Sequence, residues 1–246
     1  MRDDLVLSDL GTAHADPGHD VFDLALRGAA IALLTHDGRE LPLDPVRWYL
    51  PAAGEDQWLL DRCPGSTLDL GCGPGRLVVA LGQRGVPVLG IDCSRRAVRE
   101  CRARGGAAVR RDLFRPLPEE GSWDHVLLAD GNIGIGGDPM RLLGRAATAV
   151  REGGSILVET AGPGSLAVDP SSAGHLLLGQ PWWRGRARLA DLDDPATGTG
   201  WFPWAVIGTS ALVAIAQELG LTVGDRHCGQ RHFVELYRPA DRVDSP

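Results

Sequence analysis

The sequence predicts an α/β protein built on a mostly parallel sheet with helices on both faces. From residue 66 onward, short apolar segments typical of buried strands alternate with amphipathic segments typical of helices. The first strand runs into a glycine-rich turn, and the last two strands are joined by a link too short for a parallel crossover. Together these observations indicate a doubly wound sheet that includes an antiparallel C-terminal strand.

The central segments follow one another without long gaps. We expect strands at 67–70, 86–91, 107–113, 125–129 and 155–159. We expect helices at 76–84, 94–104 and from 139 onward. Asp138 and Pro139 suit a helix start, because Asp caps the first turn and Pro needs no N–H donor there. Gly153 and Gly154 are expected to end that helix.

The flanking segments are less regular. Residues 20–28 are expected to form a short amphipathic helix that stops at a glycine, and 55–63 a second helix. Residues 30–50 form either a hairpin around an Asp-Gly turn or an irregular lead-in. The chain is expected to close with a helix and two antiparallel strands, at 207–219, 221–225 and 232–237.

Composition restricts the class of partner. The 246 residues and the 43% hydrophobic content suit one α/β domain with an elaboration. The formal charge of −7 argues against nucleic acid, whose binders present a basic face, and favours a small-molecule ligand. No apolar run predicts a membrane span or a secretory signal. The scattered cysteines predict neither a metal site nor disulfides, and they suit a cytoplasmic protein.

The glycine-rich turn carries the strongest functional signal. After the first strand the chain reads Asp69-Leu70-Gly71-Cys72-Gly73-Pro74-Gly75. Glycines at this place let the backbone turn sharply and let a ligand approach it closely. A dinucleotide fingerprint, Gly-x-Gly-x-x-Gly, requires a glycine where Arg76 stands. The alternating glycines therefore disfavour a nicotinamide cofactor.

The segment from Asp69 to Gly75 resembles motif I of the class I, Rossmann-like S-adenosylmethionine-dependent methyltransferases. The resemblance covers residues 66–160 motif by motif, and the predicted topology is similar to the seven-stranded sheet of that family. It implies a methyltransferase that binds S-adenosyl-L-methionine and releases S-adenosyl-L-homocysteine. In that family the glycine loop contacts the methionine part of the cofactor, and the acid at the position of Asp69 interacts with its amino-acid end.

Acidic residues also close the next three strands. A carboxylate at Asp92 can accept both ribose hydroxyls, and the resemblance places Asp112 near the adenine amino group. One such Asp alone is more often a helix cap or a turn residue, but four after four successive strands favour a ligand site. The predicted cofactor-binding residues are Asp69, Gly71, Cys72, Gly73, Gly75, Asp92, Cys93, Asp112, Leu113, Asp130, Gly131 and Asn132.

The implied reaction is an in-line displacement on the methyl carbon of a sulfonium. The protein mainly supplies orientation and the exclusion of water, and a general base is needed only if the nucleophile must lose a proton. For each histidine a structural role is the default. The candidates for a catalytic group are Asp130, Glu159, His175, His227 and His232.

Residues 162–205 interrupt the core and are rich in Trp and Arg. Arg184, Arg186 and Arg188 alternate, so they share one face of an extended chain. They suggest a lid that excludes water and holds an anionic group of a small acceptor. A small core of tryptophans under solvated arginines is an equally weighted alternative. The candidate acceptor residues are Trp183, Arg184, Arg186, Trp201 and Trp204.

We expect one domain over the whole chain. Its expected parts are a flexible arm (1–19), a lead-in (20–65) and a cofactor-binding core (66–161). They are followed by a substrate-side insertion (162–205) and a terminal helix with hairpin (206–239). A small-molecule methyltransferase is the favoured function. A non-catalytic S-adenosylmethionine-binding protein on the same fold remains open, and an NAD-dependent oxidoreductase is the least favoured alternative.

Overall fold

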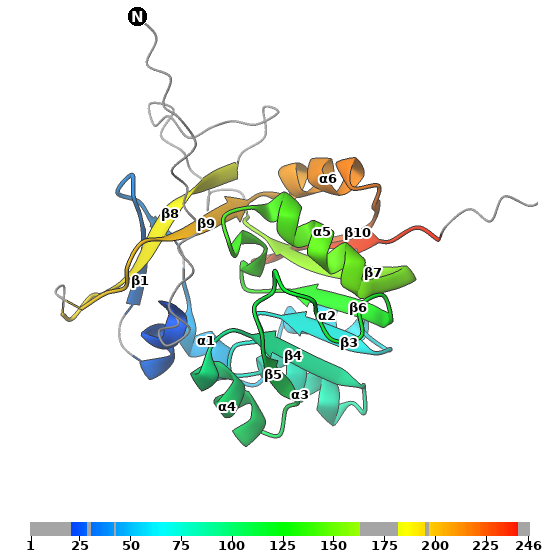
Figure 1. Cartoon of the computed structure of the whole chain (residues 1–246), viewed down its shortest axis with the longest axis horizontal. Coiled ribbons are helices and arrows are strands. Elements are labelled where there is room, and N and C mark those ends of the chain that lie inside the picture. The colour runs from blue at the N-terminus through cyan, green and yellow to red at the C-terminus, as the bar shows by residue number, and fades with distance from the viewer. Residues whose placement is uncertain (1–20, 29–30, 42, 163–181, 195–196, 241–246) are drawn as a thin grey trace, which may run out of the picture.

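The computed structural model describes residues 21–28, 31–41, 43–162, 182–194 and 197–240. The predicted arm and His175 lie outside these residues. Figure 1 shows a large central sheet between helices and a smaller sheet, containing β1, β8 and β9, that stands beside it. In the part of the chain that the structure describes, no helix combines the length and apolarity that crossing a bilayer requires.

The large sheet has seven strands in the order β10-β11-β7-β6-β3-β4-β5. Its five parallel strands are β3 (Thr67–Leu70), β4 (Val88–Asp92), β5 (Ala108–Arg110), β6 (Trp123–Leu128) and β7 (Val150–Thr160). The strand β11 (His232–Tyr237) runs antiparallel both to β7 and to β10 (Thr222–Cys228). The predicted doubly wound sheet with an antiparallel C-terminal strand is confirmed.

Helices cover both faces of this sheet. One face packs against α5 (Pro139–Ala149) and α6 (Thr209–Glu218). The other face packs against α2 (Asp56–Asp61) and α3 (Arg76–Gln83), with α4 (Arg95–Ala103) beside α3. The strands are apolar on both sides because successive side chains point to opposite faces, and both faces are buried.

Two predicted boundaries are wrong. Of the helix predicted over 20–28, the described residues 21–28 form two 3₁₀ turns instead, η2 (Val21–Asp23) and η3 (Ala25–Arg27). Its glycine stop is confirmed, since Gly28 is left-handed. The glycines at 153–154 do not end α5, which stops at Ala149, and they lie inside β7.

The third predicted strand is also shorter than expected. Residues 107–113 contribute only Ala108–Arg110 to the sheet, at its edge. Beyond that point the Asp112 carboxylate accepts a hydrogen bond from the Phe114 backbone N–H, which forms a local turn instead of a strand. This turn brings Asp112 to the carboxyl edge of the sheet.

The lead-in and the insertion together form the second sheet. It is antiparallel, with the order β2-β1-β8-β9. Its strands are β1 (Ile31–Thr35), β2 (Glu40–Leu41), β8 (Trp182–Asp191) and β9 (Phe202–Ile207). The hairpin alternative for residues 30–50 is therefore confirmed, and the described part of the insertion is largely regular sheet.

The second sheet is fixed to the large one through β9. Trp204 of β9 pairs with Ile135 in an isolated bridge, just after the 3₁₀ turn η4 (Asn132–Gly134). The backbones approach so closely that a Cβ atom at Gly134 would lie 2.0 Å from the carbonyl oxygen of Ala205. This contact holds the second sheet over the carboxyl end of β6.

Candidate functional site

Two adjoining cavities lie at the carboxyl edge of the parallel strands. The smaller, about 280 Å³, is lined by the glycine turn, and the larger, about 620 Å³, lies between the ends of β7 and β11 and the second sheet. Ligands of open α/β sheets bind at this edge. The cavities share the residues Leu43, Trp48, Asp130 and Trp204.

The smaller cavity gathers almost all of the residues expected to bind a cofactor. Two of the predicted cofactor-binding residues do not line the smaller cavity: Gly75 lines neither cavity, and Gly131 lines the larger one. The glycine turn and the strand-end acids come together because parallel strands end at the same edge of the sheet. The residues of the set that line the smaller cavity are Asp69, Gly71, Cys72, Gly73, Asp92, Cys93, Asp112, Leu113, Asp130 and Asn132.

The glycines of the turn have different roles. Gly71, Gly73 and Gly75 all have positive φ, which an L side chain rarely adopts. A Cβ atom at Gly73 would meet nothing within 4 Å, so this side of the turn is open to a ligand. A Cβ atom at Gly75 would lie 2.3 Å from the Sγ of Cys101 in α4. Gly75 therefore lets α3 and α4 pack closely and does not line the cavity.

Alanine substitutions at Gly73 and Gly75 should separate the cost of backbone strain from the cost of overpacking. Gly73→Ala should cost about 1–2 kcal/mol of unfolding free energy, since it adds only left-handed strain. Gly75→Ala should cost about 1–3 kcal/mol more, because the new methyl group also overpacks the contact with Cys101. Urea unfolding of both variants measures the difference. Equal losses would contradict the assignment of Gly75 to helix packing.

Backbone donors hold the strand-end acids in place. The Asp92 carboxylate accepts the Gly73 N–H at 2.8 Å and the Ser94 N–H at 2.9 Å, so it braces the glycine turn against the start of α4. The Asn132 side chain donates to the carbonyl oxygens of Leu70 at 3.0 Å and Gly71 at 2.9 Å. These contacts fix the turn and the end of β6 relative to each other.

Asp69 is the buried acid of the smaller cavity. Burial, followed by the nearby charge of Asp130, raises the pKa of Asp69 to about 7, although Arg76 opposes this shift. A carboxyl group in apolar surroundings resists ionisation in this way. Asp69 therefore gains or loses its charge close to neutral pH.

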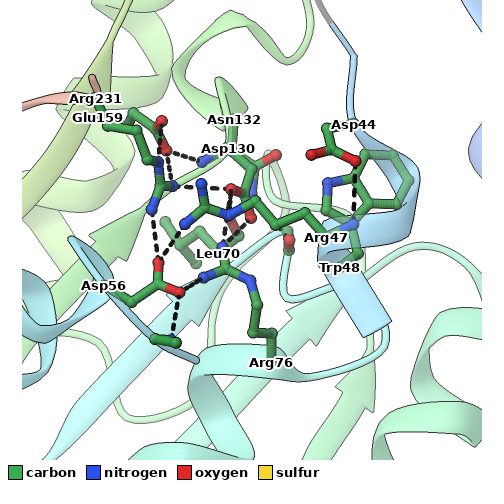
Figure 2. Close-up of polar contacts among 12 residues, drawn as sticks. Asp44, Arg47, Trp48, Asp56, Leu70, Arg76, Asp130, Asn132, Glu159 and Arg231 are labelled. Atoms are coloured by element: carbon green, nitrogen blue, oxygen red, sulfur yellow. Dashed lines mark hydrogen bonds and ion pairs between the residues drawn. The ribbon is translucent and has the colours of Figure 1, made fainter. Parts of the chain in front are cut away.

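Asp130 lies at the centre of a buried ionic network (Figure 2). Its backbone is left-handed, with a φ of 52°, at the end of β6. Arg76 donates from Nη2 to both of its carboxylate oxygens, at 2.8 and 2.6 Å, and Arg231 donates from Nη2 at 2.9 Å. The Asp130 N–H also donates to Glu159. Side chains from α3, from β7 and from the residue before β11 thus fix an uncommon backbone conformation.

Three arginines and three carboxylates balance one another in this network. Arg231 also donates to Glu159 at 2.7 Å and to Asp56 at 2.6 Å, and Asp56 further pairs with Arg76 and with Arg47. Burial alone would raise the pKa of Asp56, but the arginines outweigh it and hold the pKa below its usual value. Figure 2 shows these guanidinium groups converging on Asp56 and Asp130.

The sequence analysis missed Arg231, Arg76, Arg47 and Asp56 as parts of the site. Arg231 directly precedes β11. Because β11 runs antiparallel to β7, it begins at the edge of the sheet where the parallel strands end. The available signal was therefore a charged residue directly before the last strand. Arg76 directly follows the glycine turn, which was a second signal.

Removing Arg231 should be costly, because it would leave three carboxylates short of a buried partner. Arg231→Met should lower the unfolding free energy by about 3–5 kcal/mol. Arg84→Met is the matched control, because Arg84 and its partner Asp61 keep 37% and 63% of their side chains exposed. The control should lose at most about 1 kcal/mol. Guanidinium unfolding measures both, and similar losses would show that the network adds little.

The catalytic candidates differ in their positions. Asp130 and Glu159 line the larger cavity, but arginines hold both carboxylates. His227 is hydrogen-bonded to Glu55 at 2.8 Å and lines neither cavity. His232, the first residue of β11, lines the larger cavity. Among the described residues, no group of three His, Cys, Asp or Glu side chains is arranged to hold a metal ion.

Trp204 is the one acceptor candidate that the structure brings to the cavities, where it lines both. Trp183 is buried under the second sheet and donates to Asp37 at 3.3 Å. Arg184 and Arg186 share one face of β8, as predicted from their alternation, but that face is exposed. Trp201 is 41% exposed. These four residues line neither cavity.

Comparison with known proteins gives a family for the central segment and a fold for the chain. A family described as a methyltransferase domain matches residues 67–154. No curated protein matches the chain. The family match covers the glycine turn and the four strands from β3 to β6. The resemblance that the glycine turn predicted is therefore confirmed.

Several solved structures share the fold. A SAM-dependent methyltransferase from Bacteroides fragilis, in complex with S-adenosyl-L-homocysteine, has a TM-score of 0.68 at 21% identity over 89% of this chain and 93% of its own. The CcbJ methyltransferase from Streptomyces caelestis has a TM-score of 0.56 at 17% identity, over 75% of this chain and 88% of its own. The glycopeptide N-methyltransferase MtfA, complexed with S-adenosyl-L-methionine, has a TM-score of 0.55 at 16% identity, over 78% of this chain and 96% of its own. At these identities the likeness establishes the fold.

Proposed function

We propose that this chain, whose residues 67–154 are a methyltransferase domain, transfers a methyl group from S-adenosyl-L-methionine to a small-molecule acceptor. The observation that carries this proposal is the pair of cavities that meet at Asp130. Methyl transfer requires cofactor and acceptor side by side, with the methyl group at their boundary. One cavity presents the glycine turn and the strand-end acids, and the other faces it with its own polar groups.

The residues of the smaller cavity suit this cofactor. Gly73 leaves open space beside the turn. Asp69 would hold the amino group, Asp92 the ribose hydroxyls and Asp112 the adenine amino group, with Leu113 beside the ring. When bound, the cofactor supplies an electrophilic methyl group on a positively charged sulfur. The protein orients that group toward the larger cavity and excludes water from it.

The larger cavity has the volume of a small-molecule site, for which about 300–1,000 Å³ is usual. It combines apolar walls from the second sheet with polar groups from the terminal hairpin. Arg47, which keeps 27% of its side chain exposed, is the cation placed to hold an anionic group of the acceptor. His232 is the group placed to receive a proton from the nucleophile.

The thiols favour a reducing compartment for this reaction. None of the five cysteines, all of which lie in the described part of the chain, forms a disulfide, and Cys93 and Cys228 are exposed. Exposed cysteines outside disulfides are typical of a reducing compartment such as the cytoplasm. We therefore place the enzyme in the cytoplasm, where a small-molecule acceptor also suits its formal charge of −7.

Isothermal titration calorimetry tests the cofactor assignment. The protein should bind S-adenosylmethionine and S-adenosylhomocysteine but not NAD. Asp92→Asn should weaken binding by about 1.5–3 kcal/mol, or about 10- to 160-fold, because a charge-assisted acceptor is lost. Asp61→Asn, at an exposed ion pair on α2, is the matched control and should leave the affinity unchanged.

Two results would contradict the proposal. Binding of NAD without either sulfur ligand would favour the oxidoreductase alternative. Binding of the sulfur ligands with no methyl transfer to any member of a broad small-molecule library would favour a non-catalytic binding protein. Mass spectrometry for a product heavier by one methylene unit measures that transfer.

Cofactor affinity should depend on pH through Asp69. Because its pKa is raised to about 7, Asp69 loses a proton when the ligand's ammonium group binds beside it. Affinity for S-adenosylhomocysteine should therefore fall as the pH drops below about 7, by up to about tenfold per pH unit. Calorimetry at pH 6 in two buffers of different ionisation enthalpy should show proton release. Asp69→Asn should abolish both effects, and a pH-independent wild-type affinity would contradict the assignment.

A further inference from the structure

Aromatic rings wall the smaller cavity where it meets the larger one. We propose that Trp48 and Trp204 form a cation-recognising wall at this boundary, one that binds positively charged S-adenosylmethionine in preference to neutral S-adenosylhomocysteine. This inference rests on the proposed function and goes beyond it, because it assigns the recognition of charge at sulfur to two residues of this chain.

Four aromatic residues that line the smaller cavity form one cluster. The ring centroid of Phe22 lies 5.5 Å from that of Trp204, 5.6 Å from that of Phe202 and 6.2 Å from that of Trp48. Phe22 and Phe202 line the smaller cavity and not the larger. Trp48 and Trp204 line both. The two tryptophans therefore mark the boundary.

In the proposed reaction the sulfur of the cofactor would lie at this boundary. In the transfer, a lone pair of the acceptor forms the new bond to the methyl carbon. The carbon–sulfur bond breaks, and its electron pair stays on sulfur as a neutral thioether. The methyl group would thus pass from the smaller cavity to the larger, across the boundary that the shared residues line. Groups that line both cavities are the ones placed to meet the sulfur.

Asp130 is the acidic group at the same boundary, but its charge is already matched. Two guanidinium groups, those of Arg76 and Arg231, bind its carboxylate directly. A carboxylate so engaged offers little further attraction to a sulfonium. The indole faces carry no formal charge, yet their quadrupole attracts a cation, and Trp does so more strongly than Tyr or Phe. Recognition of the positive sulfur therefore falls to the rings.

Both tryptophans are held by the fold before any ligand binds. Trp204 is 7% exposed and is fixed by the backbone bridge between β9 and Ile135. The carbonyl oxygen of Trp48, on α1 (Pro45–Tyr49), accepts a hydrogen bond from Arg104 at 3.2 Å. Phe22 packs against both indole rings, with its centroid 6.2 Å from that of Trp48 and 5.5 Å from that of Trp204, so the rings are positioned before a cation binds.

Loss of the charge in the reaction then has a consequence for turnover. Once the methyl group has left, the thioether no longer interacts with the quadrupoles of the rings. Cation–π attraction corresponds to about two- to thirtyfold in affinity, with the larger values at desolvated sites. The wall therefore weakens product binding relative to substrate binding by this factor and favours release of S-adenosylhomocysteine.

The test compares two ligands that differ by one methyl group and one charge. Calorimetry gives the ratio of the Kd for S-adenosylhomocysteine to the Kd for S-adenosylmethionine. The wild-type ratio should be above 1. Trp48→Leu and Trp204→Leu should each lower it about threefold or more, through weaker S-adenosylmethionine binding, with the S-adenosylhomocysteine Kd changed less than twofold. The affinity for sinefungin, which carries an ammonium group in place of the sulfonium, should fall in these variants in parallel with the affinity for S-adenosylmethionine.

Trp201→Leu is the matched control, because Trp201 is a tryptophan of the same region that is 41% exposed and lines neither cavity. Its ratio should stay at the wild-type value. Trp48→Phe and Trp204→Phe, which preserve a ring, should keep part of the discrimination and provide the measurement if a leucine variant does not fold.

Two results would overturn the inference. One is a ratio that both tryptophan variants leave unchanged. The other is a ratio that falls in Asp130→Asn but not in the tryptophan variants, which would assign the discrimination to the carboxylate. A wild-type protein that binds neither sulfur ligand would instead overturn the proposed function itself.

Discussion

The buried network of three arginines and three carboxylates is the interaction on which the site depends. It joins the lead-in, through Arg47 and Asp56, to the end of β6 at Asp130 and to the terminal hairpin at Arg231. Each buried charge costs several kcal/mol unless it is paired, so no one member can be removed without cost. Segments separated by most of the chain are thereby held in one arrangement. That arrangement determines the shape of the wall that the two cavities share.

The part of the site that could be predicted from the sequence is the part that local pattern determines. Gly71 and Gly73 follow a buried strand, and Asp92 follows the next one, so the parallel topology alone brings them together. Arg231 could not be predicted in the same way. Its place at the site depends on β11 running antiparallel, and a single arginine before a strand has many other uses. Asp56 lies in an expected helix, where an acid usually faces solvent.

The second sheet shows a different limit of prediction. The alternation of Arg184 and Arg186 with Trp183 predicts two faces of a strand, and the structure confirms the alternation. Which face meets the ligand depends on the elements that cover it, and the sequence of β8 does not contain that information. The same holds for Trp201 and Trp204, which are three residues apart. One is exposed and the other lines both cavities, because β9 packs against the loop after β6.

Neutral balance in the network and the aromatic wall are two parts of one electrostatic arrangement. A free carboxylate at the boundary would bind a sulfonium tightly, but it would stabilise the ground state more than the transition state, in which the positive charge on sulfur is already reduced, and so slow the reaction. Arginines around Asp130 remove that free charge while keeping a polar, rigid wall. Trp48 and Trp204 then supply an attraction weak enough to be given up in each turnover. The ionic network thus positions the cavities and also sets the charge that the reacting sulfur meets.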